Sequence, residues 1–348
     1  MTDAPPAGTS LSLAALGEWE LIRRLARFAP PGQFKDDAAV LEHDASAGAL
    51  VVNTDVLVEG VHFSERTTGP WDVGWRAAAA NLSDLAAMGC TTVVGLTVGL
   101  VAPATTPWSW VEGVYAGLTG CLSRLGGVLL GGDCSSGRER LLAITALGRL
   151  PAVDATTPED GPATTGPIRR ADGRPGDWLV SSGPHGLSRL GLALLQGELG
   201  EAPTAELARR AIAAHRRPQP RFDVVRALID CRPADLPWRV GGCDSSDGLA
   251  AAVTAIASCS GCNAYLDRDA LPLETGMADL HEAEAWCLAG GEDFELVLAL
   301  APPWASALCQ ALRGCRVVGV LEAGQADGLR WTDGGIVAPQ LGGYRHFG

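Results

Sequence analysis

The chain has 348 residues, of which 47% are apolar and 19% charged; this composition is globular, and the length exceeds that of one compact core. No apolar run approaches the roughly 20 residues of a membrane-spanning helix, and MTDAPPAGTS lacks the pattern of a secretory signal, so we expect a cytoplasmic protein without a membrane partner. The net charge of −13 argues against a nucleic acid or an anionic membrane surface as partner.

The first half of the chain predicts an α/β domain over residues 17–150, preceded by a disordered lead-in at 1–16. Apolar residues at helical spacing, short apolar runs and stopping glycines define its elements. We expect helices at 17–29, 71–89 and 108–126, and strands around 38–41, 50–54, 91–100, 127–133 and 141–150.

Residues 151–176 are rich in Pro, Thr, Gly and Asp and show no apolar period, which predicts a linker or insertion and a domain boundary. The second domain, 177–348, repeats the alternation of strands and helices. Its expected helices lie near 186–197, 202–216, 220–230, 249–258 and 303–313, and its strands at 177–183, 294–300 and 315–321. The fold class is therefore α/β or α+β, with the strand order left open.

The cationic residues limit how this chain can bind phosphate. Lys35 is the only lysine, and no G-x-x-x-x-G-K-[ST] motif occurs. If phosphates are bound, metal ions must supply much of the positive charge. The ten cysteines are scattered without a disulfide framework, so we expect reduced, mostly buried thiols. The close pair Cys259 and Cys262 leaves a redox pair or half a zinc site as alternatives.

Aspartates recur at the ends of apolar strands or in loops of small residues. These are Asp36, Asp37, Asp55, Asp84, Asp133, Asp244 and Asp247. Each one alone could be a turn residue or a helix N-cap. That interpretation is weakest for Asp84, which is predicted inside a helix three residues after Asn81, and for the loop CDSSDG at 243–248.

Carboxylates gathered in one pocket raise one another's pKa, and a hard divalent cation removes that cost. Mg²⁺ prefers oxygen ligands and commonly bridges carboxylates to phosphate groups. Glycines beside Asp133 and Asp247 would let a phosphate chain approach the backbone closely. The residues alone therefore indicate a Mg²⁺-nucleotide site built from aspartates.

The motifs that carry these aspartates resemble the thiamine-monophosphate kinase family, within the superfamily of aminoimidazole-ribonucleotide synthetase. They occur in the family's order and span nearly the whole chain. They are GEWELI (17–22), DDAAV (36–40), NTDVLVEGVHF (53–63), NLSDLAAMG (81–89), GGD (131–133), SDGL (246–249) and GGEDFEL (290–296).

The resemblance implies a two-domain fold whose N-terminal mixed sheet forms a homodimer and whose C-terminal domain is α/β. It implies transfer of the γ-phosphate of ATP, the co-substrate, to thiamine monophosphate. The implied ligands of several Mg²⁺ ions are Asp37, Thr54, Asp55, Asp84, Asp133, Asp244 and Asp247. The implied ATP contacts are Tyr115, Gly132, Asp133, Arg170 and Ser246. The implied contacts to thiamine monophosphate are His62, Glu292 and Tyr344.

The implied reaction needs no dedicated catalytic base. A phosphate monoester is largely dianionic near neutral pH, because its second pKa is roughly 6. Its attacking oxygen is therefore already deprotonated, and metal ions bridging it to ATP would permit a direct in-line transfer.

The chain departs from the family pattern at several positions. Lys35 stands where glycine is usual, Asn53 replaces serine or threonine, Cys134 replaces threonine and Ser245 replaces an apolar residue. The stretch 151–168 is also longer. Since every matched acid is present, we interpret these departures as tuning.

Simpler roles remain open for some of the named residues, and other functions remain open for the chain. Without the family pattern, His62 would be a structural histidine, Glu292 and Asp293 turn residues, and Tyr344 a packing aromatic. The competing functions are a related synthetase with another acceptor, such as formylglycinamidine ribonucleotide or selenide, a metal-dependent phosphatase, and a silent Mg²⁺-nucleotide sensor. No cysteine precedes Cys90 to serve a selenide enzyme, and the chain lacks the terminal cysteine of the hydrogenase-maturation relative.

Overall fold

The computed structural model describes residues 11–16, 18–28, 48–152, 165–200, 203–324 and 328–338. These residues form two compact units, each described here by itself. Residues 54–81, 94–146 and the described residues before 43 make the first unit. Residues 48–53, 82–93 and the described residues from 147 onward make the second. No described helix has the length and hydropathy needed to cross a membrane.

The two units contain helices and strands in alternation. The α-helices are α1 (Leu13–Leu16), α2 (Glu18–Leu25), α3 (Pro70–Ala87), α4 (Trp108–Leu125), α5 (Leu187–Gln196), α6 (Ala205–Arg216), α7 (Phe222–Asp230), α8 (Leu249–Ser260), α9 (Ala283–Ala289) and α10 (Pro302–Ala311). The strands are β1 (Leu50–Val58), β2 (Thr92–Ala102), β3 (Val128–Ser136), β4 (Leu141–Arg149), β5 (Trp178–Ser181), β6 (Gly241–Asp244), β7 (Cys262–Leu266), β8 (Leu296–Leu300), β9 (Arg316–Ala323) and β10 (Leu329–Trp331). Short 3-10 turns cover 26–28, 170–172 and 268–270.

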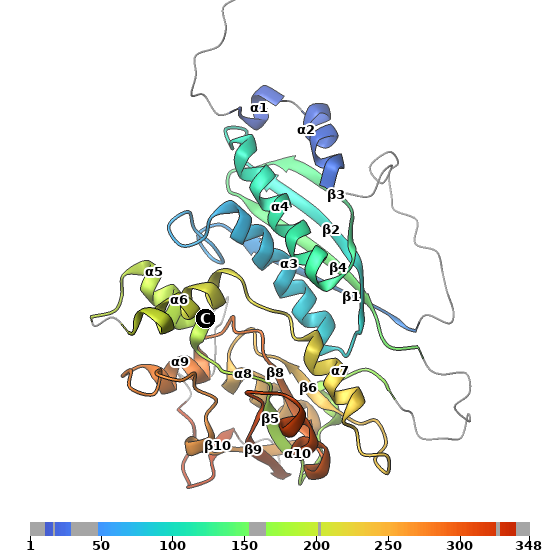
Figure 1. Ribbon diagram of the computed structural model, residues 1–348, viewed down its shortest axis with the longest axis vertical. Coiled ribbons are helices and arrows are strands. Elements are labelled where there is room, and N and C mark those ends of the chain that lie inside the picture. Colours follow the sequence, from blue (N-terminus) through green and yellow to red (C-terminus); the bar gives the residue numbers. More distant parts are fainter. Residues whose placement is uncertain are drawn as a thin grey trace, which may run out of the picture. The chain divides into compact units, whose positions relative to one another are not determined.

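The first unit is built on a four-stranded sheet in the order β1-β4-β2-β3, in which β2 and β3 are parallel. Helices α3 and α4 lie along the sheet (Figure 1). Their crossing is close because glycines meet there. A Cβ on Gly74 would lie 1.9 Å from the Val114 carbonyl oxygen, and one on Gly117 would lie 1.9 Å from that of Trp71. Any larger residue at either position would force the two helices apart.

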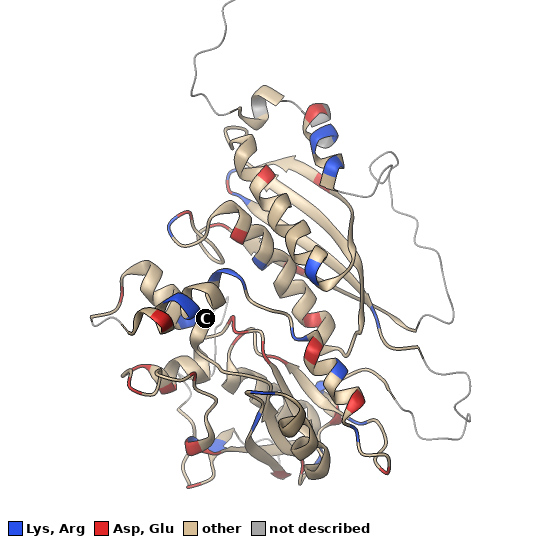
Figure 2. Cartoon of the chain, viewed as in Figure 1, with Lys and Arg blue, Asp and Glu red and all other residues tan. Residues whose placement is uncertain are grey.

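One face of this sheet is buried and the other is largely open. Burial alternates strictly along β4, where Leu142, Ile144 and Ala146 are fully buried. On β1, by contrast, Val52 is 62% and Val56 is 44% exposed. Figure 2 shows that α3, α4 and the strands carry few charged side chains. The open face therefore exposes apolar side chains such as Val52 and Val56.

The second unit is built on a six-stranded mixed sheet in the order β10-β7-β9-β5-β8-β6. Its pairings are antiparallel except for β10 with β7. Helix α8 packs on β6, β7 and β8, whereas α10 packs on β5 and β9 and contacts α7. All five residues of β8 are buried, as expected for a strand covered on both faces. Helices α5 and α6 pack against each other in a separate small core (Figure 1).

Most predicted elements are present, with several corrections. β1 and β3 continue to Val58 and Ser136, so Asp55 and Asp133 lie inside strands and do not end them. Small polar side chains do not stop a strand whose backbone remains paired. Cys243 and Asp244, expected in the loop 243–248, form the end of β6. Elements β7, α9 and β10 were not predicted, and a short helix occupies part of the expected lead-in. The strand expected around 38–41 lies outside the described residues.

Candidate functional site

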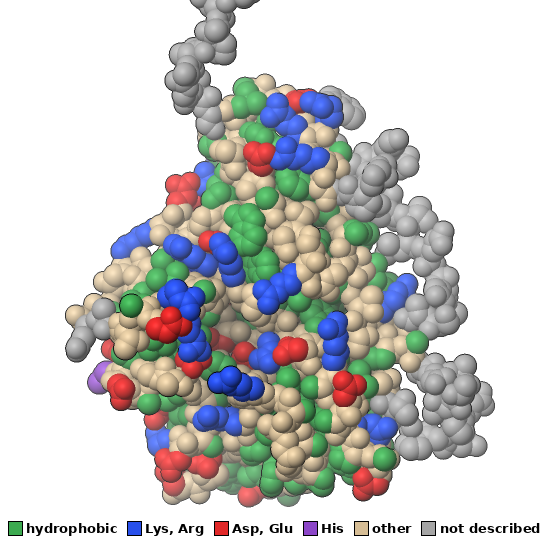
Figure 3. All heavy atoms as spheres, in the orientation of Figure 1, with side chains coloured by type: hydrophobic (Ala, Val, Ile, Leu, Met, Phe, Trp, Pro, Cys, Tyr) green, Lys and Arg blue, Asp and Glu red, His purple; other side chains and the backbone are tan. Residues whose placement is uncertain are grey.

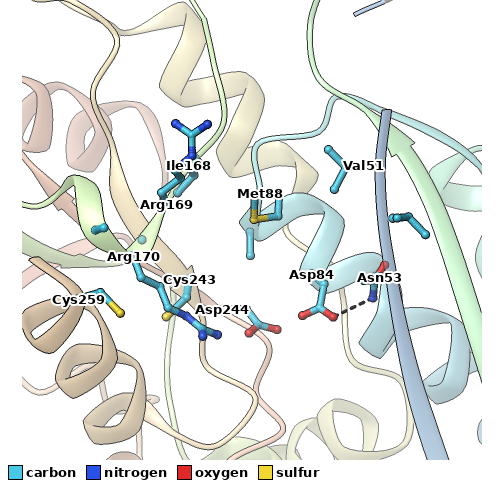
Figure 4. Close-up of a pocket in the computed structure, with 14 residues that line it drawn as sticks. Val51, Asn53, Asp84, Met88, Ile168, Arg169, Arg170, Cys243, Asp244 and Cys259 are labelled. Carbon is cyan, nitrogen blue, oxygen red and sulfur yellow. Dashed lines mark hydrogen bonds between the residues drawn. The ribbon is translucent and has the colours of Figure 1, made fainter. Parts of the chain in front are cut away.

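The second unit contains a cavity of about 580 Å³ to which five separate segments contribute (Figure 4). The segments are the start of β1, the end of α3, residues 168–171, β6 and the end of α8. The lining residues are Val51, Val52, Asn53, Asp84, Ala87, Met88, Ile168, Arg169, Arg170, Ala171, Gly242, Cys243, Asp244 and Cys259. Three residues predicted for the metal or ATP site, Asp84, Arg170 and Asp244, thus line one cavity.

Asp84 projects into this cavity from the last turns of α3. The helix ends just beyond it, where Gly89 adopts a φ of +88° that favours glycine. The Asn53 side-chain amide donates a hydrogen bond to Asp84 Oδ2 at 2.8 Å (Figure 4). Asn53 stands where the family usually has serine or threonine, and its amide here orients the Asp84 carboxylate. Asp84 serves no cap here, and the sequence prediction of an aspartate inside the helix is confirmed.

Asp244 is the last residue of β6 and is only 7% exposed. The Ser83 hydroxyl, on the turn of α3 that carries Asp84, donates to Asp244 Oδ2 at 2.7 Å. The loop then turns outward, because Ser246 and Asp247 are exposed before α8 begins. The CDSSDG sequence therefore places one acid in the cavity and the next acid at the surface.

Arginines supply the positive charge of the cavity. Arg169 lies 3.9 Å from Asp172 and its side chain is 61% exposed. The Arg170 side chain extends toward Cys243 and Asp244 in Figure 4. Burial raises the pKa of the Cys243 thiol to about 12, and Arg170 opposes that shift by proximity and hydrogen bonding. Cys243 is therefore an uncharged wall of the cavity.

In the first unit, Asp55 and His62 form a second candidate group. The Asp55 backbone N–H donates to Asn81 Oδ1 at 3.0 Å, which ties β1 to α3. Burial raises the pKa of Asp55, and the nearby His62 lowers it in part. His62 Nδ1 accepts a hydrogen bond from the Val58 N–H at 3.1 Å, so neutral His62 carries its proton on Nε2. In this tautomer Nε2 is the donor atom of the ring.

The other predicted residues of the first unit lie apart from Asp55. Thr54 points to the opposite, open face, where its hydroxyl is 2.8 Å from that of Thr145. Asp133 is exposed on β3, and two strands separate β3 from β1, which is roughly 14 Å at ordinary strand spacing. Tyr115 is 2% exposed, and burial raises the pKa of its hydroxyl well above the usual value. The sheet therefore does not bring these residues together by itself.

Gly132 has a clear structural reason to be glycine. It pairs with Val98 in the parallel β2/β3 ladder. A Cβ at this position would lie 2.0 Å from the Val98 carbonyl oxygen. A side chain here would therefore separate the two strands.

Glu292 lies on a loop that sequence reasoning could also have interpreted as a simple turn. Its φ of 57° lies in the left-handed region, and its backbone N–H donates to the Ser246 carbonyl at 2.7 Å. The loop 290–296 is thus bonded to the CDSSDG loop. Sequence reasoning missed the contacts of Ser83 with Asp244 and of His215 with Glu292, because both join residues far apart in the chain.

Two of the predicted site residues cannot be located. Asp37 and Tyr344 lie outside the described residues. Within the part of the chain that the structure describes, no three His, Cys, Asp or Glu side chains are placed to hold a metal ion. All ten cysteines are free, and five of them are buried, so the CSGC pair forms no disulfide.

Comparison with known proteins identifies the family. The AIR synthase related protein family matches with its N-terminal domain at residues 35–150 and its C-terminal domain at 174–332. Thiamine-monophosphate kinase from Synechococcus elongatus is 45% identical over 338 residues, 97% of this chain and 98% of that protein. The enzyme from Prochlorococcus marinus is 44% identical over 327 residues, 92% of each chain. The chain belongs to the thiamine-monophosphate kinase family.

Solved structures agree with this assignment and confirm the two-domain α/β fold. Thiamine-monophosphate kinase from Stenotrophomonas maltophilia has a TM-score of 0.73 at 29% identity, covering 91% of this chain and 95% of that one. AaThiL complexed with AMPPCP and TMP has a TM-score of 0.70 at 29% identity, covering 98% and 100%. Hydrogenase maturation protein HypE from Escherichia coli, at 18% identity and a TM-score of 0.72, shares the fold alone.

Proposed function

We propose that this protein is an ATP-dependent kinase that phosphorylates thiamine monophosphate, giving thiamine diphosphate and ADP. The observation that carries the proposal is 44–45% identity to thiamine-monophosphate kinases over more than nine-tenths of the chain. The structure of AaThiL with AMPPCP and TMP supports an ATP-type nucleotide as donor. The reaction is a transfer to a phosphate acceptor in thiamine diphosphate biosynthesis.

The proposed cofactor is Mg²⁺, and the residues present fit it. The candidate donors Asp55, Asp84, Asp133, Asp244 and Asp247 offer only oxygen, which suits a hard cation. Asp55 and Asp244 are substantially buried, and burial raises the pKa of Asp55, so a nearby cation would stabilise its charged form. Bound Mg²⁺ would neutralise phosphate charge. Asp37 and Thr54 also remain proposed ligands. The Thr54 hydroxyl faces Thr145, so Thr54 would bind the metal through another of its groups.

The chain's own residues would bind and orient the two substrates. Arg170 lines the cavity and could hold a nucleotide phosphate there, and Ser246 is exposed two residues beyond Asp244, which also lines it. His62 would donate from Nε2 to the acceptor, and Glu292 would offer a partly exposed carboxylate. Tyr115 and Gly132 would shape the nucleotide site by packing. No side chain acts as base, because the acceptor phosphate is already ionised.

A homodimer is part of the proposal. The open face of the four-stranded sheet exposes Val52, Val56 and Val128, and such an apolar face favours burial against a second copy. Light scattering should give twice the chain mass, and Val56→Glu should shift the protein toward the monomer. A cytoplasmic location is proposed with it, since ATP is plentiful there and the ten thiols are unbridged.

The test is product identification with ATP and Mg²⁺, with and without thiamine monophosphate. Thiamine diphosphate formed one-for-one with ADP is the expected result. ADP and free phosphate formed regardless of acceptor would instead identify a phosphatase, and ATP binding without turnover would identify a sensor. Thiamine should be a poor acceptor because it lacks the phosphate that bridging metal ions would bind.

A further inference from the structure

The loop between α9 and β8 has a backbone that the surrounding structure must hold in place. Gly291 has a φ of 67°, and Glu292 and Phe294 have φ values of 57° and 53°. Among the described residues, Glu292 and Phe294 are the non-glycine residues with positive φ. Such conformations persist only when the surroundings over-determine them, and they cluster at ligand sites.

Two of the three acids in this loop hold the loop in place. Asp293 accepts the Gly186 N–H at 2.7 Å and the Ser188 N–H at 2.9 Å, at the start of α5. Glu295 pairs with Arg221, and the Ser182 hydroxyl donates to it. Both carboxylates are therefore buried in structural contacts.

The third acid, Glu292, is presented differently. Its side chain is 34% exposed, and its Oε2 lies 3.7 Å from Nδ1 of His215. His215 lies at the end of α6 and is 2% exposed. Its Nδ1 atom is also 3.3 Å from the Ser188 hydroxyl oxygen. The partly exposed carboxylate of Glu292 thus borders a buried imidazole at the end of α6, which packs on α5.

The ends of the segment 215–221, HRRPQPR, both contact this loop. His215 reaches Glu292, and Arg221 reaches Glu295. The sequence predicts the start of this segment in the helix near 202–216 and its end in the helix near 220–230. In the structure its first and last residues border the strained loop, and Glu292 is the acid of that loop whose side chain is about one-third exposed to solvent.

We propose that His215 is a positioning residue for acceptor recognition, fixing the Glu292 carboxylate in the orientation that meets thiamine monophosphate. The inference rests on the proposed function. Thiamine monophosphate carries a cationic thiazolium ring and an aminopyrimidine, and a carboxylate held in advance binds such groups without first losing its own rotamer freedom. His215 itself touches no substrate, so its loss acts on acceptor binding and leaves the nucleotide site unchanged.

The experiment compares His215→Leu, His215→Asn and a matched control, Thr204→Ala. The Thr204 hydroxyl accepts from the Leu207 N–H and caps α6 at its opposite end, so its loss destabilises the same helix without touching Glu292. Initial rates give kcat and separate KM values for ATP and thiamine monophosphate, and calorimetry gives the Kd of thiamine monophosphate alone.

We expect His215→Leu to raise KM and Kd for thiamine monophosphate about tenfold, with KM for ATP within twofold of wild type. His215→Asn, which keeps a polar atom near the position of Nδ1, should recover most of the loss. Thr204→Ala should lower thermal stability and leave both KM values unchanged. In a Glu292→Gln background, His215→Leu should have little further effect, because the two act through one contact.

Equal rises in both KM values, or an unchanged acceptor KM and Kd in folded His215→Leu, would overturn the positioning role. Additive effects of the two substitutions would overturn it too. Wild-type protein that makes no thiamine diphosphate would overturn the proposed function first, and this inference with it.

Discussion

The buried carboxyl of Asp293 predicts an unusual pH dependence of stability. Burial raises its pKa from 3.8 to about 7, against the lowering effect of the N–H groups of Ser188 and Gly186, while Glu295 and Glu292 raise it further. The folded-state pKa therefore exceeds the unfolded one. The contribution of Asp293 to the free energy of unfolding is complete below about pH 4 and is lost as the pH rises toward 7, because ionising the buried acid opposes folding.

The magnitude follows from the shift. A difference of about 3 pKa units at roughly 1.4 kcal/mol each amounts to about 4 kcal/mol in total. Because an unfolded aspartate is ionised at pH 5, roughly 40% of this is already lost there, and roughly 2 to 3 kcal/mol remains to be lost between pH 5 and pH 8. Asp293→Asn removes that dependence and costs about 1 kcal/mol for an imperfect contact with two N–H donors.

The assay is urea unfolding of wild type and Asp293→Asn at pH 5, 6, 7 and 8. The difference between the two proteins isolates Asp293 from other titrating groups, such as buried His185, whose pKa burial lowers to about 4. The variant should equal or slightly exceed wild type in stability at pH 5 and be about 3 kcal/mol more stable at pH 8. A difference that stays constant within about 0.5 kcal/mol would refute the reasoning. The N–H groups of Gly186 and Ser188 would then outweigh burial and keep the acid ionised throughout.

Three further outcomes are expected. Asp84→Asn keeps the side-chain shape but removes a charge from the proposed metal set, so kcat should fall at least a hundredfold with the melting temperature retained; near-normal turnover would make Asp84 structural. Gly132→Ala should lower the unfolding free energy by about 2 kcal/mol, because its Cβ meets a β2 carbonyl oxygen at 2.0 Å, whereas Gly131→Ala, with open space around it, should be near neutral. Cys309 and Cys315, with sulfurs 3.6 Å apart, should form a disulfide with oxidised glutathione, detected as a mass loss of two hydrogens; two glutathionylated thiols would contradict this.

The helices of the first unit could be predicted because their sequence signals are local. Alanine-rich, apolar stretches followed by Gly89 and Gly126 define α3 and α4 within two residues of their ends. β6 and α9 could not be predicted in this way. The GGCD sequence of β6 is typical of a loop, and it becomes a strand only because it pairs with β8 over fifty residues later.

The candidate site divides along the same line. The residue types pointed to Asp84 and Asp244 as ligands. The contact that joins the helix of Asp84 to Asp244 is a hydrogen bond from Ser83, which lies 161 residues from Asp244 in the chain. The same holds for His215 and Glu292. One local signal was available. The three acids of GGEDFEL need positive charge nearby if they are buried, and the basic HRRPQPR segment supplies it.

The distribution of arginines leads to a final prediction about metal dependence. Several arginines are already paired with acids of the chain, including Arg221 with Glu295 and Arg239, which binds the buried Asp177 in bidentate fashion. Figure 3 shows basic side chains in several small groups on one face, with acidic side chains beside some of them.

Within the described residues, Arg169 and Arg170 are the cationic side chains of the cavity, and together they balance only part of the charge of a triphosphate and a phosphate monoester. We propose that divalent cations supply the rest. Turnover should therefore vanish in excess EDTA and rise more steeply than the first power of free Mg²⁺ at low concentration, if several ions take part. Turnover that persists in EDTA would mean that the protein neutralises both substrates with its own side chains.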